Sequence, residues 1–199
     1  MNSRHTWLCT AWRQVFGEAG GQVPDRNIER ILRTTNIPIA SNNQRRLDLV
    51  VPGLAVYEGQ PLFCDVTVVS PLSGHGRARA GTSNRGGRLL QDAERDNNNT
   101  YAEVTSSGLG KLLCLGVETF GRWGSDCIQL VPLLAREHSR GLHPRIRRGC
   151  MLGFQRRWWG ILGIALQTSV AEMILRDDGA DLPTTLLEPA LGVAALPSL

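Results

Sequence analysis

Two apolar runs near the middle of the chain, RRLDLVV and PLFCDVTVV, each carry one aspartate among aliphatic neighbours. Both runs are rich in β-branched residues and lie between turn-forming residues, which predicts strands over 46–51 and 62–69 joined as a β-hairpin. The embedded aspartates are Asp48 and Asp65. A carboxylate buried in a strand loses its hydration, so a cation or a hydrogen-bond donor has to compensate it.

Helical and extended patterns alternate around this hairpin. Apolar spacing predicts a helix over 7–18 that ends at Gly20-Gly21, followed by a short extended piece near 22–24. The patterns then predict a mobile basic loop, a helix, a central apolar strand covered on both faces, and two further helices, at 71–87, 88–104, 111–118, 126–137 and 145–175. This order predicts an α/β fold with a small mixed β-sheet flanked by helices.

Size and composition favour an ordinary globular domain. A chain of 199 residues suffices for one core-bearing domain, which we expect at 1–176 with a poorly ordered tail at 177–199. The apolar content is 42% and the charged content is 20%, which disfavours a disordered chain. Polar residues interrupt the longest apolar stretch, 158–175, and this favours an amphipathic helix over a membrane span.

The cysteines give no metal-binding or disulfide pattern. There are five of them, none in CxxC spacing, and no histidine lies at a zinc-finger interval from any of them. Cys64 and Cys114 fall in expected strands, where buried free thiols are common. Free thiols favour a reducing compartment, and the first residues, MNSRHTWLCTAWRQ, lack the apolar core of a signal peptide. We therefore expect an intracellular protein with no membrane partner.

The basic residues are almost all arginines. The net charge is +4, the isoelectric point is near 9.1, and Lys111 is the only lysine. Arginine suits phosphate recognition, although biased codon usage would give the same pattern. Residues 81–87 lack the lysine of a nucleotide-binding loop and the hydroxyl residue that directly follows it, so we expect nucleic acid rather than a small-molecule substrate. The arginines expected to bind it are Arg77, Arg79, Arg85, Arg88, Arg156 and Arg157.

The two aspartates have a chemical and a structural interpretation. Carboxylates on neighbouring strands repel unless a divalent ion bridges them, and oxygen-only ligands favour Mg²⁺ or Mn²⁺. Such an ion activates water for phosphodiester hydrolysis, and Thr67 would point to the same face as Asp65. In the structural alternative, Asp48 pairs with Arg45 or Arg46 and Asp65 caps a turn.

Six segments of the chain resemble the restriction-endonuclease-like domain at the C-terminus of certain non-LTR retrotransposon polyproteins. In chain order they are EAGG, RRLDLVV, PLFCDVTVVSPL, AERDNNNTYAEV, VETFGRW and FQRRWWGIL, and the resemblance runs from about Trp7 to Leu175. Relatives have the PD-(D/E)XK nuclease fold, whose core is a helix, three strands, a helix and a strand. The resemblance implies a nuclear, metal-dependent endonuclease that nicks target DNA, so that the freed 3′-hydroxyl primes reverse transcription.

The resemblance also implies roles for individual residues. Asp48 matches the first aspartate of the nuclease motif and Asp65 matches the second acidic residue, so both are implied ligands of Mg²⁺ (or Mn²⁺). Glu18 matches a helix acid that some relatives add to the metal site. Thr67 stands where many nucleases of this fold carry lysine, and we expect it to orient the attacking water.

One position departs from the family pattern. In the retrotransposon branch the basic residue lies in the following helix, ahead of a tyrosine; Tyr101 is present here, but Asn97 stands at the expected lysine position. Arg95 supplies charge but stays protonated, so it is a poor proton donor or acceptor. A second hypothesis is therefore a remnant of such an element that binds DNA, or the element RNA, without catalysis. A third is an α/β domain whose aspartates are structural.

Overall fold

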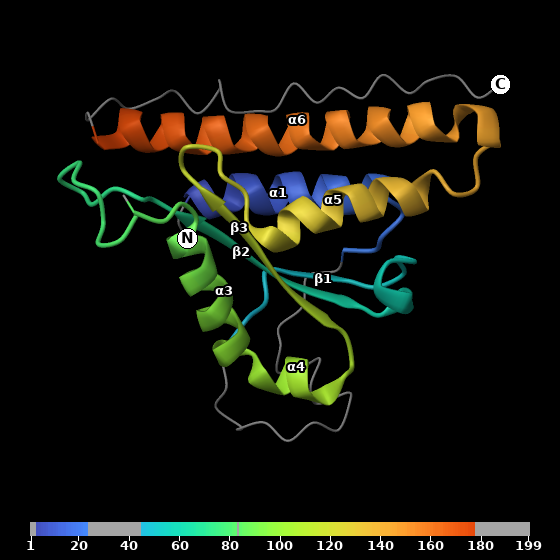
Figure 1. Cartoon of the computed structure of the whole chain (residues 1–199), viewed down its shortest axis with the longest axis horizontal. Helices are drawn as coiled ribbons and strands as arrows, with labels where there is room; N and C mark the ends of the chain where they lie inside the picture. The colour runs from blue at the N-terminus through green and yellow to red at the C-terminus, as the bar shows by residue number, and fades with distance from the viewer. Residues whose placement is uncertain (1–2, 24–44, 83, 178–199) are drawn as a thin grey trace.

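The structure is a computed structural model that describes residues 3–23, 45–82 and 84–177. The described residues form a mixed α/β fold in which a small three-stranded sheet has helices on both faces (Figure 1). The described elements are α1 (Ser3–Glu18), β1 (Leu49–Val51), the 3-10 helix η1 (Tyr57–Gly59), β2 (Leu62–Val69), α3 (Arg88–Thr100), α4 (Ala102–Ser107), β3 (Lys111–Glu118), α5 (Ser125–His138) and α6 (Pro144–Asp177).

Strand β2 lies in the middle of the described sheet. It pairs with β1 antiparallel, with Leu49 opposite Cys64, so the predicted hairpin is confirmed. It pairs with β3 in parallel along the full length of both strands, starting with Leu62 opposite Lys111. Among the described strands β3 therefore lies at an edge, and the prediction that it is central is wrong. Its continuous apolar run reflects helices on both of its faces, because every β3 residue except Lys111 is buried.

The larger core lies between the sheet and two layers of helices. Helices α1 and α5 cover one face of the sheet, and α6 packs across both of them from outside (Figure 1). Alternate residues of all three strands face this core, which includes Trp12, Phe16 and Trp158. Trp158 is fully buried in it. Helices α3 and α4 cover the opposite face with a smaller cluster around Phe63 and Tyr101.

The predicted end of α1 agrees with the structure, whereas two other predicted boundaries differ from it. Helix α1 ends at Glu18 as predicted, and Gly20 then takes a left-handed φ of +92°, which favours glycine. The predicted helix over 88–104 is instead two helices, because the backbone at Tyr101 leaves the helical region (φ −118°, ψ 38°). Strand β1 is shorter than predicted because the chain bends at Asp48. Residues 22 and 23 of the expected extended piece form no strand, and its last residue lies in 24–44, outside the described residues. Nearly all of the expected tail lies in 178–199, also outside them.

Helix α6 is the longest of the described helices. Residues Pro144–Leu175 are long and apolar enough to cross a membrane by length and composition alone. A core helix passes the same test, and α6 contributes Trp158, Leu162 and Leu166 to the main core. It also buries the polar residue Glu172, whose carboxylate accepts a hydrogen bond from the Trp7 indole at 3.0 Å. These contacts favour the predicted amphipathic helix.

Substitutions on α6 test this packing. Leu162→Ala removes a fully buried side chain, and we expect it to lower the free energy of unfolding by about 2–5 kcal/mol. Ile164→Ala, on the same helix but 71% exposed, should change that energy by less than about 0.5 kcal/mol. Urea denaturation of both variants measures the difference. Equal losses would mean that α6 does not pack on α1 as described.

Candidate functional site

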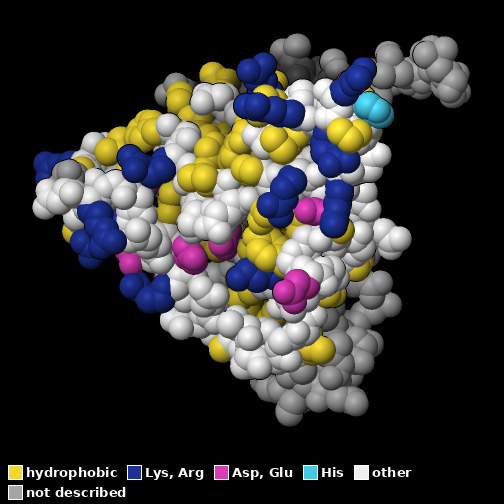
Figure 2. Space-filling view, turned by 45° about the vertical axis from the view of Figure 1, so that its right-hand side comes forward, with side chains coloured by type: hydrophobic (Ala, Val, Ile, Leu, Met, Phe, Trp, Pro, Cys, Tyr) yellow, Lys and Arg dark blue, Asp and Glu magenta, His cyan; other side chains and the backbone are white. Residues whose placement is uncertain are grey.

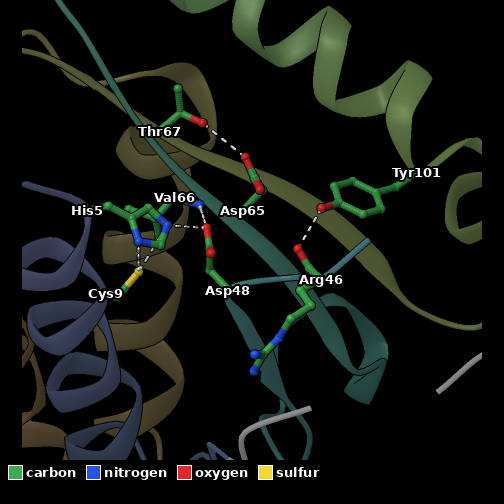
Figure 3. A network of polar contacts seen from close by, with 8 residues as sticks. All are labelled: His5, Cys9, Arg46, Asp48, Asp65, Val66, Thr67 and Tyr101. Atoms are coloured by element: carbon green, nitrogen blue, oxygen red, sulfur yellow. Dashed lines mark hydrogen bonds and ion pairs between the residues drawn. The ribbon is translucent and has the colours of Figure 1, made fainter. Parts of the chain in front are cut away.

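Asp65 and Thr67 of β2 face α3 across a hollow of about 290 Å³. Their strand neighbours Cys64 and Val66 pack into the main core on the opposite face, so period-2 alternation fixes this direction. The Thr67 hydroxyl donates a hydrogen bond to Asp65 Oδ2 at 3.0 Å (Figure 3). Thr67 and Asp65 therefore share one face, as predicted. The remaining lining residues are Ala93, Asp96, Asn97, Thr100 and Tyr101.

Asp48 lies beside Asp65 at the start of β1. Because Leu49 pairs with Cys64, the same register places Asp48 opposite Asp65. Its Oδ2 atom accepts a hydrogen bond from the Val66 backbone N–H at 2.7 Å, in the position of the next rung of the β1–β2 ladder. The same Oδ2 lies 2.8 Å from Nε2 of His5 on α1 (Figure 3). The carboxylate thus ties the end of the hairpin to the first helix.

The structural alternative expected Arg45 or Arg46 beside Asp48, whereas among the described residues Asp48 is paired with His5 and Arg45 with Glu103 of α4. Asp65 lies within β2 rather than at a turn. The hydrogen bond to Asp48 raises the pKa of His5 to about 10, so this imidazole carries a positive charge at neutral pH. No local sequence pattern predicts the contact between His5 and Asp48. The two residues are 43 positions apart, and packing in the core determines where α1 lies.

The two aspartates interact electrostatically. Burial raises the pKa of Asp65, and the negative charge of Asp48 raises it further, whereas the Thr67 hydroxyl and His5 lower it. The side chains reach different partners, since Asp48 contacts α1 through His5 and Asp65 faces α3 (Figure 3). A divalent cation between them would relieve this repulsion and compensate their lost hydration.

Glu18 does not join these aspartates. It ends α1, whereas His5 lies in the first turn, and a rise of 1.5 Å per residue separates the two by roughly 20 Å. Its carboxylate accepts hydrogen bonds from Arg157 at 2.6 and 2.9 Å and from the Trp158 indole at 2.9 Å. The Arg157 guanidinium lowers the pKa of Glu18 to about 2. The position that resembles a helix acid therefore links α1 to α6.

Asn97 occupies the same hollow as Asp65. It is only 6% exposed, and among the described residues its Oδ1 atom has no hydrogen-bond partner. A buried acceptor without a donor costs about 1–3 kcal/mol, so a donor or cation entering the hollow would gain this interaction. One helical turn later, Tyr101 donates a hydrogen bond to the Arg46 carbonyl at 2.8 Å. The residue at the expected lysine position is thus next to the predicted site.

The predicted nucleic-acid-binding arginines fall into two groups. Arg77, Arg79, Arg85 and Arg88 are exposed on the loop before α3 and at its start. Arg156 and Arg157 are exposed on α6, where Arg157 is already paired with Glu18. Figure 2 shows Lys and Arg side chains in separate groups on the visible face, with apolar and neutral surface between them.

The first arginine group adjoins the aspartate hollow. Arg85, Arg88 and Arg95 line a second hollow of about 380 Å³, which also includes Gln91 and Asp92. On α3, Asp92 and Arg95 of this second hollow each lie one residue from a position that lines the hollow of Asp65, namely Ala93 and Asp96, so the two hollows occupy adjacent faces of the same helix. A phosphate backbone held by these arginines would pass beside Asp65.

Sequence analysis missed one cluster. Cys9 Sγ lies 3.5 and 3.6 Å from the two ring nitrogens of His5, beside Asp48 (Figure 3). This pair does not match the Cys–His intervals of a zinc finger; the available signal was its i, i+4 spacing, which places both side chains on one helix face. All five cysteines are free, and Cys64 and Cys114 are buried as predicted.

No protein-family model matches the chain, and no curated protein matches it. The functional assignment therefore depends on the side chains gathered around Asp48 and Asp65 and on the six sequence segments.

The Glu18 contacts predict a pH dependence. The pKa of Glu18 is lowered from 4.5 to about 2 in the folded protein, so its contribution to stability is complete above pH 4.5. That contribution is lost as the pH falls from 4.5 toward 2, because over this window the unfolded state takes up a proton that the folded state does not bind. Unfolding free energies measured across this window should fall more steeply for the unsubstituted protein than for Glu18→Gln. Parallel curves would contradict the Arg157 contact.

Proposed function

We propose that this chain is a Mg²⁺-dependent DNA endonuclease domain of a retroelement, built on a restriction-endonuclease-like core. It would nick one strand of target DNA so that the freed 3′-hydroxyl primes reverse transcription. The observation that carries the proposal is the placement of Asp65, Thr67 and Asn97 around one hollow, with Asp48 on the adjoining strand end.

The element order supports the same proposal. Helix α1, the β1–β2 hairpin, α3 and β3 follow one another as in the core of that fold, with β3 parallel to β2. The fold has three strands before its second helix, and β1 and β2 account for two of them. The residues between α1 and β1 lie mostly outside the described part of the chain.

The donor set fits a hard divalent cation. The carboxylates of Asp48 and Asp65 would hold Mg²⁺, with the Asn97 amide oxygen available from α3; such all-oxygen ligands are those that Mg²⁺ prefers. Among the described residues, both hydrogen-bond partners of Asp48 use Oδ2. When bound, Mg²⁺ lowers the pKa of water and neutralises phosphate charge. Thr67 orients Asp65 and lies where it can position the attacking water.

A nucleic-acid-binding remnant is the second candidate. Asn97 is neutral and cannot transfer a proton as the lysine of the family does, and it lies in the hollow itself. In this case the arginines around α3 would still bind DNA, or the element RNA, and the aspartates would serve only to hold the hairpin and α1 together.

A nicking assay separates the two candidates. With Mg²⁺ or Mn²⁺, we expect slow nicking of supercoiled plasmid that Asp65→Asn abolishes. Asn97→Lys should raise the rate, toward the roughly 10²–10⁴-fold that a positioned proton-transfer group contributes. Asp92→Asn, which removes a carboxylate from the neighbouring hollow, is the matched control. If folded, DNA-binding Asn97→Lys protein still gives no metal-dependent nicking, the remnant is the better assignment.

The arginine contacts predict salt-dependent binding. The affinity for non-specific DNA should fall linearly with salt on a double-logarithmic plot, because phosphate contacts release counterions. Arg85→Ala and Arg88→Ala should each reduce the slope by about 1. Arg140→Ala is the control, since this side chain is 78% exposed and outside both hollows. Fluorescence anisotropy measures the slopes, and a slope that neither Arg85→Ala nor Arg88→Ala changes would remove this surface from the interface.

A further inference from the structure

His5, Cys9 and Asp48 form a cluster with three different kinds of metal-binding atom. Each residue offers one such atom, and the three atoms all lie within 4.8 Å of one another. It is the one group of at least three His, Cys, Asp or Glu residues in the described part of the chain that meets this distance. All five cysteines and all four histidines belong to that part.

The backbone fixes two of these side chains without any contribution from a metal. His5 and Cys9 are four residues apart on α1, so their side chains lie on one face of the helix. Asp48 comes from the bend before β1 and is held there by the Val66 N–H. None of the three is fully buried or fully exposed, so an ion can reach the cluster from solvent.

The chemistry of the donors selects the kind of ion. Imidazole and thiolate ligands suit Zn²⁺, whereas Mg²⁺ binds oxygen ligands. In a tetrahedral Zn²⁺ site with bonds of about 2.0–2.3 Å, ligand atoms lie roughly 3.3–3.8 Å apart. The Cys9–His5 distances of 3.5 and 3.6 Å fall within that range. The His5–Asp48 distance of 2.8 Å would lengthen slightly as a metal replaces the shared proton.

We propose that His5, Cys9 and Asp48 form a Zn²⁺ site with three protein ligands and a fourth position open to water. On binding, the Cys9 thiol and the His5 imidazolium each release a proton to solvent, and the ion takes their place between the side chains. The site goes beyond the proposed nuclease, because its formation requires neither Asp65 nor DNA.

The site shares one ligand with the proposed Mg²⁺ site. Asp48 Oδ2 faces His5, whereas Asp65 faces the hollow under α3. Zn²⁺ held at His5 and Cys9 would engage Asp48 from the α1 side. The two sites are therefore distinguishable by substitution, since Cys9 contributes to the first and Asp65 to the second.

Cobalt spectroscopy tests the proposal without any activity measurement. Co²⁺ replaces Zn²⁺ in such sites, and a thiolate ligand gives an intense near-ultraviolet charge-transfer band. The full chain titrated with Co²⁺ under reducing conditions should develop this band at one equivalent and lose it when Zn²⁺ is added. Cys9→Ser should abolish the band, and His5→Gln should weaken binding by at least about 10–100-fold, the loss seen even for outer-shell partners.

Cys150→Ser is a matched control, because Cys150 is also a free, half-buried helical cysteine. This variant should keep the band, and circular dichroism should show that all variants are folded. A band that survives Cys9→Ser, or Co²⁺ and Zn²⁺ affinities that are equal in the unsubstituted and Cys9→Ser proteins, would overturn the proposal. Asp65→Asn should leave the band unchanged; its loss in that folded variant would place the metal in the aspartate hollow instead.

Discussion

The parallel pairing of β2 with β3 is the constraint on which the rest of the fold depends. A tight turn cannot join parallel strands, so the chain must leave β2 at Val69 and return at Lys111 through a crossover. That crossover contains the arginine-rich loop, α3 and α4, which cover one face of the sheet. The hollow at Asp65 exists because α3 passes over this face, and the loop arginines lie near it for the same reason.

The bend at Asp48 provides the second connection. A side-chain carboxylate replaces one backbone acceptor of the hairpin and also binds the first turn of α1 through His5. One residue therefore joins the sheet, the first helix and the aspartate pair. The Asp48 carboxylate would bind a metal while it also holds the hairpin to α1. A substitution of Asp48 therefore affects both the stability of the fold and metal binding. Asp65 makes fewer such contacts and is the cleaner position for testing catalysis.

Local patterns predicted much of the fold because they record burial on short segments. The alternation in LFCDVTVV and the apolar run KLLCLGVE predicted β2 and β3 with their boundaries, and the spacing of apolar residues predicted α1 and α6. The break at Tyr101 was missed because the long-range hydrogen bond that holds this side chain to the Arg46 carbonyl leaves no local sequence pattern. The edge position of β3 was missed because burial by helices and burial by strands leave the same apolar run.

The candidate site was predicted in part for the same reason. Strand register brings Asp48, Asp65 and Thr67 together, and register follows from local alternation. Glu18 and His5 depend instead on how α1 lies against the sheet and α6, which the pattern of α1 does not specify. Helix α1 places His5 beside Asp48 and Glu18 beside Arg157. The resemblance implies instead that Glu18, the acid of this helix, lies at the metal site.

The central claim is that Asp48 and Asp65 together bind a hard divalent cation. A crystal structure of the protein grown with Mn²⁺ tests it most directly, because anomalous scattering locates the ion independently of any assumed chemistry. We predict one Mn²⁺ bonded to carboxylate oxygens of both Asp48 and Asp65, at the opening of the hollow beneath α3. An ion bound elsewhere, or carboxylates that stay on His5 and Thr67 with no ion between them at saturating Mn²⁺, would contradict it.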